Sequence, residues 1–329
     1  GLALSVVAFC FVAAFLIWAT ADKSFSMIGM LSSSLMRATP IALAALCGVI
    51  NERAAVVNIG LEGIMLLSAQ TAVIAGTVRH HLYIGLLGAS LTGALIAAIH
   101  AFLVIRFKVD QIISGVAINI FATGATSFVS SRFLEPNTNL LNNSGTFKII
   151  IIPGLSKIPI LGPIFFENGL IVYLMLALVI GLHFLLFYTP WGLRTRAVGE
   201  HPKAADTLGV NVYLVQYVNV IIGGMIAGLG GAYFTLGSVG RFDEVMTAGK
   251  GFIGLAAMIF GNYTPIGALG AGILFGFADS LGSKLSLLGS AIPSTLMSTA
   301  PYVITMVVLA GFVGKGHVPA ADGVPYTKE

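Results

Sequence analysis

The sequence PWGLRTRAVGEHPKAADTLGVN, residues 190–211, is a polar island between two strongly apolar stretches. Only 9% of the chain is charged, yet this island is dense in ionisable side chains. They are Arg194, Arg196, Glu200, His201, Lys203 and Asp206. Charged side chains are costly away from water, so the island is predicted to lie in an aqueous loop.

A short helix is expected inside this island. Pro202 suits the first helical turn, because its missing N–H is one that the start of a helix leaves unpaired. Gly209 suits the exit, where a helix commonly ends on a residue with positive φ. Residues 203–208 would then form about two turns.

The composition defines the class of protein. Of the 329 residues, 57% are hydrophobic, and the mean hydropathy is +0.96. Such values lie far outside those of soluble domains and predict an all-α, polytopic bundle of transmembrane helices. At roughly 20 residues per span, the chain has room for about ten.

Apolar runs on both sides of the island give the expected spans. A break at Pro40 in the second span is left open, and residues 133–168 are predicted to be a structured external loop. The expected spans are 2–21, 39–50 extended back through 26–35, a run ending at residue 78, 82–105, 112–129, 169–188, 212–237, 251–260, 266–281 and 299–313. Gly224 and Gly228 have the spacing that lets membrane helices pack closely.

The spacing of Glu200, Ala204, Ala205 and Gly209 resembles the Glu-Ala-Ala…Gly loop by which permease subunits of ATP-binding-cassette (ABC) importers contact their ATPase. The resemblance implies a cytoplasmic coupling loop over residues 190–211, in which Ala204 and Ala205 permit close approach of the partner. Arg194, Arg196 and Pro202 belong to the same loop. An ordinary solvated connection between two helices is the alternative.

Two further stretches resemble the branched-chain amino acid, simple-sugar and nucleoside permease superfamily, and most closely its nucleoside (guanosine-type) subunits. They are NERAAVVNIGLEGIMLLSAQ (51–70) and GKGFIGLAAMIFGNYTPIGALGAGILFG (249–276). In the sugar members the first stretch resembles Gly-Gly-Ile-Asp-Leu-Ser, and Met65 stands here in the place of the Asp. A sugar cargo is therefore less favoured than a nucleoside, with branched-chain amino acids as a further alternative.

The resemblance also implies an architecture and a set of partners. It implies one membrane domain over residues 1–329 with a pseudo-repeated core, placed in the bacterial cytoplasmic membrane. The implied partners are cytoplasmic ABC ATPase subunits, a second permease subunit and an extracytoplasmic substrate-binding lipoprotein. Basic residues divide almost evenly between the two sides, so orientation rests on the resemblance and not on the positive-inside rule.

Polar groups inside the spans are candidates for the substrate path, because they are costly in a membrane. The candidates are Asn58, Glu62, Gln70, Asn119 and Thr123. Glu62 is either a structural group, paired with Arg53 or with backbone N–H groups, or it faces substrate. Asn119 and Thr123 share one helix face and either bond a neighbouring helix or line the path.

Several other functions are disfavoured by the sequence. Gly249-Lys250 and Gly314-Lys315 are each followed by glycine, where a phosphate-binding loop needs Ser or Thr, so no ATPase site is expected. No metal site or cofactor is predicted. The net charge of +4 is scattered over many loops, which fits anionic lipid headgroups rather than nucleic acid. An ion-coupled transporter would need carboxylates deep in several spans, and only Glu62 and Asp279 qualify.

Overall fold

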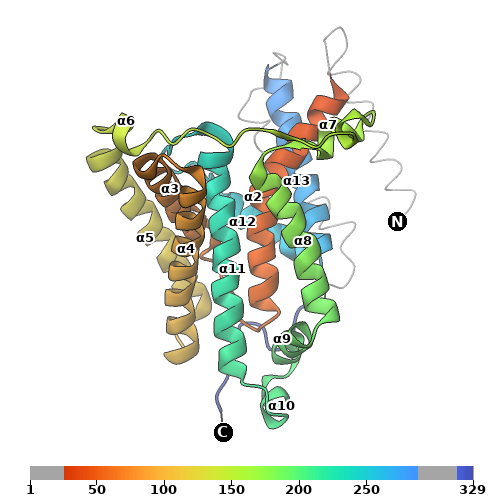
Figure 1. The fold of residues 1–329 in the computed structure, drawn as a ribbon. Helices are drawn as coiled ribbons and strands as arrows, with labels where there is room; N and C mark the ends of the chain where they lie inside the picture. Colours follow the sequence, from red (N-terminus) through yellow and green to blue (C-terminus); the bar gives the residue numbers. More distant parts are fainter. Residues whose placement is uncertain (1–25, 288–316, 329) are drawn as a thin grey trace. The chain divides into compact units, whose positions relative to one another are not determined.

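The computed structural model describes residues 26–287 and 317–328, and within these ranges the chain is predominantly helical (Figure 1). Seven of the described helices are long and apolar enough to cross a membrane. With the π-helical ends η1, η2 and η4 included, they are α2 (Met27–Glu52), α3 (Leu61–Arg79), α4–η1 (Leu82–Arg106), α5–η2 (Gln111–Leu134), α8 (Leu170–Tyr188), α11–η4 (Val212–Val239) and α13 (Pro265–Leu287). The predicted polytopic helical bundle is confirmed. The count of about ten is not, and the expected spans 2–21 and 299–313 lie outside the described residues.

Two expected spans differ from the structure. The open question at Pro40 is answered by α2, a continuous helix of 26 residues with Pro40 inside it. The predicted span 251–260 is wrong as a full span, because α12 (Lys250–Phe260) has only 11 residues. At 1.5 Å per residue this helix is about 16 Å long, roughly half of the membrane's hydrocarbon thickness. Non-helical chain from Gly240 to Gly249 precedes it.

The chain divides into two compact units. The first comprises Gly1–Ala38, Ile150–Asn168 and Ile273–Gly316. In its described part, the start of α2 packs against the second half of α13: the hydroxyls of Ser33 and Ser280 are 2.7 Å apart. Arg37 pairs with Asp279 at 3.0 Å.

The remaining elements of the first unit lie within the predicted external loop. They are β1 (Ile150–Ile151), η3 (Leu155–Lys157), α7 (Leu161–Phe165) and β2 (Glu167–Asn168). The two strands pair antiparallel, with Ile150 opposite Asn168. Residues 150–168 therefore contain short helices and a two-stranded sheet.

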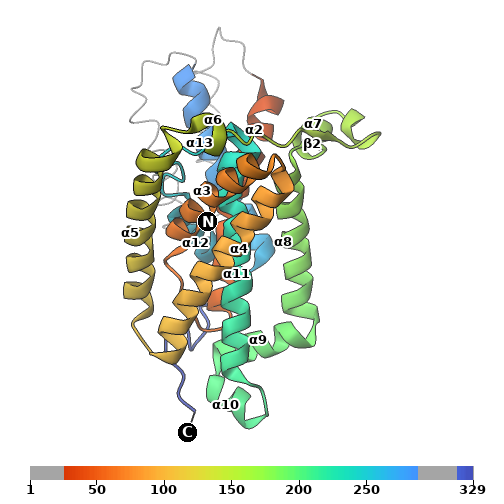
Figure 2. The ribbon, with the colours of Figure 1, turned by 60° about the vertical axis from the view of Figure 1, so that its left-hand side comes forward.

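The second unit comprises Thr39–Ile149, Gly169–Gly272 and His317–Glu329 and holds most of the long helices. Its centre is formed by α3, α4 and α11, which pack on one another, with α5 against α3 (Figures 1 and 2). The predicted glycine motif lies at this contact, since Gly224 and Gly228 of α11 meet the backbone of α4 at Gly93 and Ala89. A side chain at either glycine would collide with these carbonyl groups.

The helices of this unit differ in how much of their surface is buried. In α3, 72% of the 18-residue apolar stretch is buried, whereas in α4–η1 and α5–η2 the buried share of that stretch is 28% each. Large apolar side chains on α4 and α5 are exposed, among them Leu91, Leu95, Ile120 and Phe121. In a membrane protein such a surface faces lipid or another apolar subunit.

The polar island forms one end of the second unit. Figure 1 shows α9 (Pro190–Glu200), α10 (Pro202–Thr207) and the C-terminal segment, residues 317–328, at this end, and α6 (Thr138–Leu141) at the other. We call the first the docking end and residues 190–211 the docking segment.

Candidate docking and translocation sites

The docking segment contains two short helices where the sequence predicts one. The expected helix is present as α10, with Pro202 in its first turn. The unexpected one is α9. Thr189 caps its start: the Thr189 hydroxyl oxygen accepts a hydrogen bond from the Gly192 N–H at 3.3 Å, and Pro190 occupies the first turn. A Thr-Pro pair is a helix-start signal, so the sequence did contain the means to find α9.

The exit from α10 has the backbone that the sequence predicts. Gly209 has φ +84°, and its N–H donates to the Asp206 carbonyl at 2.9 Å. A Cβ built there would meet nothing within 4 Å, so backbone conformation alone selects glycine.

The two alanines of the docking segment differ in exposure. Ala204 is exposed, whereas Ala205 is 3% exposed and packs in a cluster with Val198, Val212 and Tyr326. The side chain of Ala205 is therefore part of the protein's own core, and only that of Ala204 is open to a partner. Helical geometry explains this, because adjacent residues point about 100° apart around the axis.

Charged side chains of the docking segment also divide into open and engaged groups. Arg194 is exposed. The Arg196 guanidinium lies over the Phe187 ring, 5.2 Å from its centroid. Glu200 is engaged by the C-terminal segment, since its carboxylate accepts from the Ala320 N–H at 3.3 Å and lies 3.3 Å from the His317 ring.

The C-terminal segment ties both docking helices to the rest of the second unit. Its Ala321 N–H donates to the carbonyl of Gly199 at the end of α9, and Lys328 pairs with Asp206 of α10 at 3.4 Å. Tyr326 is buried in the same cluster as Ala205. No local sequence pattern predicts these contacts of the C-terminal segment, because its partners lie more than a hundred residues away.

Arg53 links the end of α2 to the turn between α12 and α13. Its Nε donates to the Tyr263 carbonyl at 2.9 Å and Nη2 to the Asn262 carbonyl at 3.4 Å, so it does not pair with Glu62. Burial lowers the pKa of Arg53, and the nearby Glu200 carboxylate opposes that shift. Arg53 is thus a buried positive charge close to Glu200 and Arg196 of the docking segment.

Two carboxyl groups meet beside Arg53. Glu52 at the end of α2 and Asp322 of the C-terminal segment lie within hydrogen-bonding range of each other. Burial raises the pKa of Asp322 to about 6. It also raises the pKa of Tyr263 to about 12, with the charges of Glu52 and Asp322 adding to the effect.

Glu62 accepts hydrogen bonds from groups around the start of α12. Its Oε1 accepts from the Thr247 hydroxyl at 2.6 Å and the Gly249 N–H at 2.8 Å, and Oε2 accepts from the Gly251 N–H at 2.7 Å. A carboxylate at a helix N-terminus satisfies unpaired N–H groups and complements the helix dipole. These contacts correspond to the structural alternative for Glu62, with backbone N–H groups as partners.

The other path candidates lie near the contact of α3 and α5. Asn119 bridges the two, accepting from the Gly63 N–H at 2.7 Å and donating to the Ile59 carbonyl at 3.0 Å. Gln70 donates to the Thr126 carbonyl at 2.9 Å. Asn58 is buried and accepts from the Gly60 N–H, whereas Thr123 is exposed and donates to the Asn119 carbonyl. The structure therefore brings Asn58, Asn119 and Thr123 together and uses their polar groups within the chain.

A family model described as branched-chain amino acid transport system / permease component matches residues 30–313. The chain belongs to this family of transport permeases and, with its seven span-length helices in the described ranges, is an integral, multi-pass membrane protein. No solved structure matches it.

Individual relatives cover almost the whole chain. It is 45% identical to the guanosine ABC transporter permease protein NupQ of Bacillus subtilis, over 90% of this chain and 95% of that relative. It is 38% identical to the nucleoside ABC transporter permease protein NupC of Lactococcus lactis, over 91% and 96%. A putative glucose ABC transporter permease protein of Haloferax volcanii, TsgC13, is 34% identical over 86% and 91%. The predicted resemblance to nucleoside ABC permeases is confirmed.

Proposed function

We propose that the chain is the membrane-spanning subunit of an ABC importer that carries nucleosides across the cytoplasmic membrane. The observation that carries this proposal is near full-length similarity to guanosine and nucleoside permeases, at 45% and 38% identity. ATP hydrolysis belongs to separate ATPase subunits bound at the docking end, which faces the cytoplasm. A second permease subunit and an external substrate-binding lipoprotein complete the assembly, the lipoprotein being received on the external side through residues 133–168.

Transport is proposed to follow alternating access driven by the docking segment. This segment follows α8 directly through Thr189 and enters α11 at Asn211, whose side chain caps α11 by accepting from the Leu214 N–H. Displacement of α9 and α10 by the ATPase would therefore be transmitted to two long helices. In this arrangement about ten apolar helices form the membrane domain, and α12 crosses only part of the bilayer.

The alternative functions receive unequal support. The Haloferax relative favours a sugar as the second candidate cargo. An ion-coupled transporter is less favoured, because the two carboxylates it would use are engaged: Glu62 at the start of α12 and Asp279 with Arg37. Uptake driven by an ion gradient in the absence of any ATPase subunit would overturn the proposal.

Replacing Ala204 by Trp tests the docking role directly. The substitution adds bulk on the exposed side of α10, so the chain is expected to remain stable while co-purification of ATPase subunits falls at least about ten-fold, equivalent to 1.4 kcal/mol. The assay uses the complex purified with its co-expressed partners and measures nucleoside-stimulated ATP hydrolysis.

Two matched variants make this result specific. Ala117→Trp adds the same bulk at an exposed alanine of α5 and is expected to retain the ATPase. Ala205→Trp overpacks the Val198–Val212–Tyr326 cluster and is expected to lower thermal stability. Normal ATPase binding by Ala204→Trp would mean that the docking segment is only a solvated connector.

A further inference from the structure

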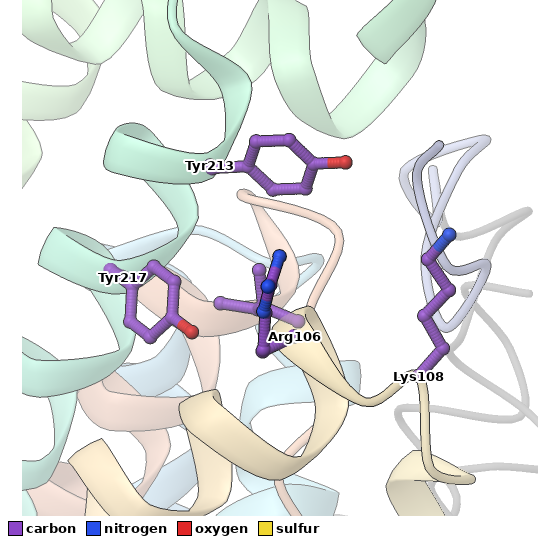
Figure 3. A pocket seen from close by; sticks show the side chains of 5 residues that line it. Arg106, Lys108, Tyr213 and Tyr217 are labelled. Atoms are coloured by element: carbon purple, nitrogen blue, oxygen red, sulfur yellow. The ribbon is translucent and has the colours of Figure 1, made fainter. Parts of the chain in front are cut away.

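A pocket opens at the docking end of the second unit, between the end of α4–η1 and the first turns of α11 (Figure 3). Its volume is about 360 Å³. It is lined by Ile105, Arg106, Lys108, Tyr213 and Tyr217. Tyr213 also takes part in the contacts of the docking end, through Tyr326 and Lys328 of the C-terminal segment. The candidate substrate path includes none of the five lining residues.

The pocket carries two positive charges that the described chain leaves unneutralised. Arg106 ends η1, and Lys108 follows with φ +56°, a left-handed backbone that is unusual for a residue with a side chain. Both are exposed, and neither forms an ion pair with a described residue. Asp110, the nearest acidic residue in sequence, uses Oδ1 to cap α5 by accepting from the N–H groups of Ile112 and Ile113.

Two half-buried tyrosines, one helical turn apart on α11, form the opposite wall. Figure 3 shows the Arg106 side chain between Tyr213 and Tyr217, with Lys108 across the opening. The Tyr213 ring packs against Tyr326 at 5.3 Å, and its hydroxyl accepts from the Lys328 N–H at 3.4 Å. Tyrosine is enriched where a membrane protein passes from acyl chains to water, because one end of the ring is apolar and the other is polar.

Exposed apolar side chains neighbour Arg106 and Lys108 along the chain, and we call Phe102 and Phe107 among them the rim. Phe102 and Phe107 are 51% and 62% exposed and touch edge to face with centroids 5.1 Å apart. Both flank Arg106 in sequence, and Ile112 and Ile113 at the start of α5 are exposed as well. On a membrane-spanning unit, such side chains contact acyl chains, so the two cations lie where the apolar surface ends.

We propose that this pocket binds the phosphodiester headgroup of an anionic phospholipid. The Arg106 guanidinium and the Lys108 ammonium supply the charge-assisted donors that phosphate oxygens accept, and the Tyr217 hydroxyl is a further donor. The aromatic rim takes the first methylenes of the acyl chains. A free phosphate would bind the two cations without contacting the rim. A soluble protein partner would likewise not contact the rim, which would remain against lipid.

The test is mass spectrometry of the intact, detergent-solubilised protein titrated with phosphatidylglycerol or phosphatidylcholine. The wild type is expected to bind phosphatidylglycerol more tightly than phosphatidylcholine. The double variant Arg106→Gln with Lys108→Gln is expected to bind phosphatidylglycerol about 30-fold more weakly, as the loss of two basic groups near an anionic surface implies. Arg106→Lys keeps the charge and is expected to retain most of the affinity.

The control is Arg132→Gln with Lys148→Gln, which removes the same charges from exposed positions outside the pocket. Its affinity for phosphatidylglycerol is expected to equal that of the wild type. Equal binding by the pocket variant and the wild type would overturn the proposal, as would displacement of phosphatidylglycerol by equimolar inorganic phosphate. Undiminished lipid binding with loss of co-purified ATPase subunits would assign the pocket to a protein interface instead.

Discussion

The docking segment and the start of α12 both place short helices and polar groups in a chain made largely of long apolar helices, but they satisfy those groups differently. The docking segment lies at an exposed end, and its ion pairs, Glu200 with His317 and Asp206 with Lys328, are formed with the C-terminal segment. At the start of α12, the Glu62 carboxylate of α3 accepts hydrogen bonds from Thr247, Gly249 and Gly251. The ion pairs of the docking end are partly exposed to water, whereas the start of α12 depends on the part-buried hydrogen bonds of Glu62.

The largest effect is therefore expected from Glu62→Ala. The substitution leaves the Thr247 hydroxyl and the N–H groups of Gly249 and Gly251 without their acceptor. Hydrogen bonds to a charged group contribute about 1.5–3 kcal/mol each, so a loss of about 3 kcal/mol or more in unfolding free energy is expected. Thermal unfolding of the purified chain in detergent measures it, and Glu62→Gln, which keeps one acceptor oxygen, is expected to lose less.

Glu135→Ala is the matched control, because Glu135 is an exposed carboxylate directly after η2. It is expected to change the unfolding temperature little. If Glu62→Ala were as stable as this control, α12 would need no carboxylate at its N-terminus, and the contrast between the two regions would disappear.

The same contrast explains which features the sequence predicts. The sequence predicts the short helix α10 because Pro202 and Gly209 lie at its two ends, and helix start and stop signals act over a few residues. The half-length of α12 was not found, since hydropathy alone makes residues 251–260 resemble a span. The helix starts only at Lys250, because the chain before it is non-helical and is held by Glu62, which lies 187 residues before Gly249.

The burial of Ala205 was missed for a related reason. Ala204 and Ala205 are chemically identical, and tertiary packing in the cluster with Val198, Val212 and Tyr326 decides which one faces inward. The long helices themselves were predicted well, because each is a continuous apolar run whose identity depends on its own residues. The sequence shows that polar residues such as Asn119 are unusual within an apolar span, but their hydrogen-bond partners depend on tertiary packing and cannot be deduced from sequence alone.

A smaller effect is expected from Gly209→Val, which sharpens the comparison at the docking end. A non-glycine residue in the left-handed region costs about 1–2 kcal/mol, and a β-branched one lies at the upper end. A Cβ at Gly209 would meet no other atom within 4 Å. The strain should therefore redirect α10 rather than unfold the long helices. Nucleoside uptake per assembled complex is expected to fall while thermal stability changes little.

Gly181→Val serves as the control for this variant. Gly181 of α8 also has open space around it but lacks a positive φ. It is expected to keep wild-type uptake. Unchanged uptake by Gly209→Val would show that the direction of α10 does not matter for transport.

The smallest effect concerns Asp322, whose carboxyl lies beside Glu52, with Arg53 and Tyr263 nearby. In the attached C-terminal segment the pKa of Asp322 is about 6, against an ordinary value of 3.8. The attached state therefore binds a proton more readily than the detached one. Attachment is strongest below pH 4 and weakens as the pH rises from about 4 to about 6, where ionisation of Asp322 opposes burial.

Asp322→Asn removes this ionisation while keeping a polar side chain of the same size. The variant is expected to match the wild type below pH 4 and to hold residues 317–328 more firmly above pH 6. Hydrogen exchange of that segment should slow by up to about ten-fold at pH 7, the equivalent of one pKa unit, since Glu52 can take up part of the change. Exchange at the start of α12 should stay constant across the same pH range, because Asp322 has no part in the Glu62 cap. A pH-independent difference between variant and wild type would instead mean that Asp322 acts only through packing, and that the docking end has no proton-dependent attachment.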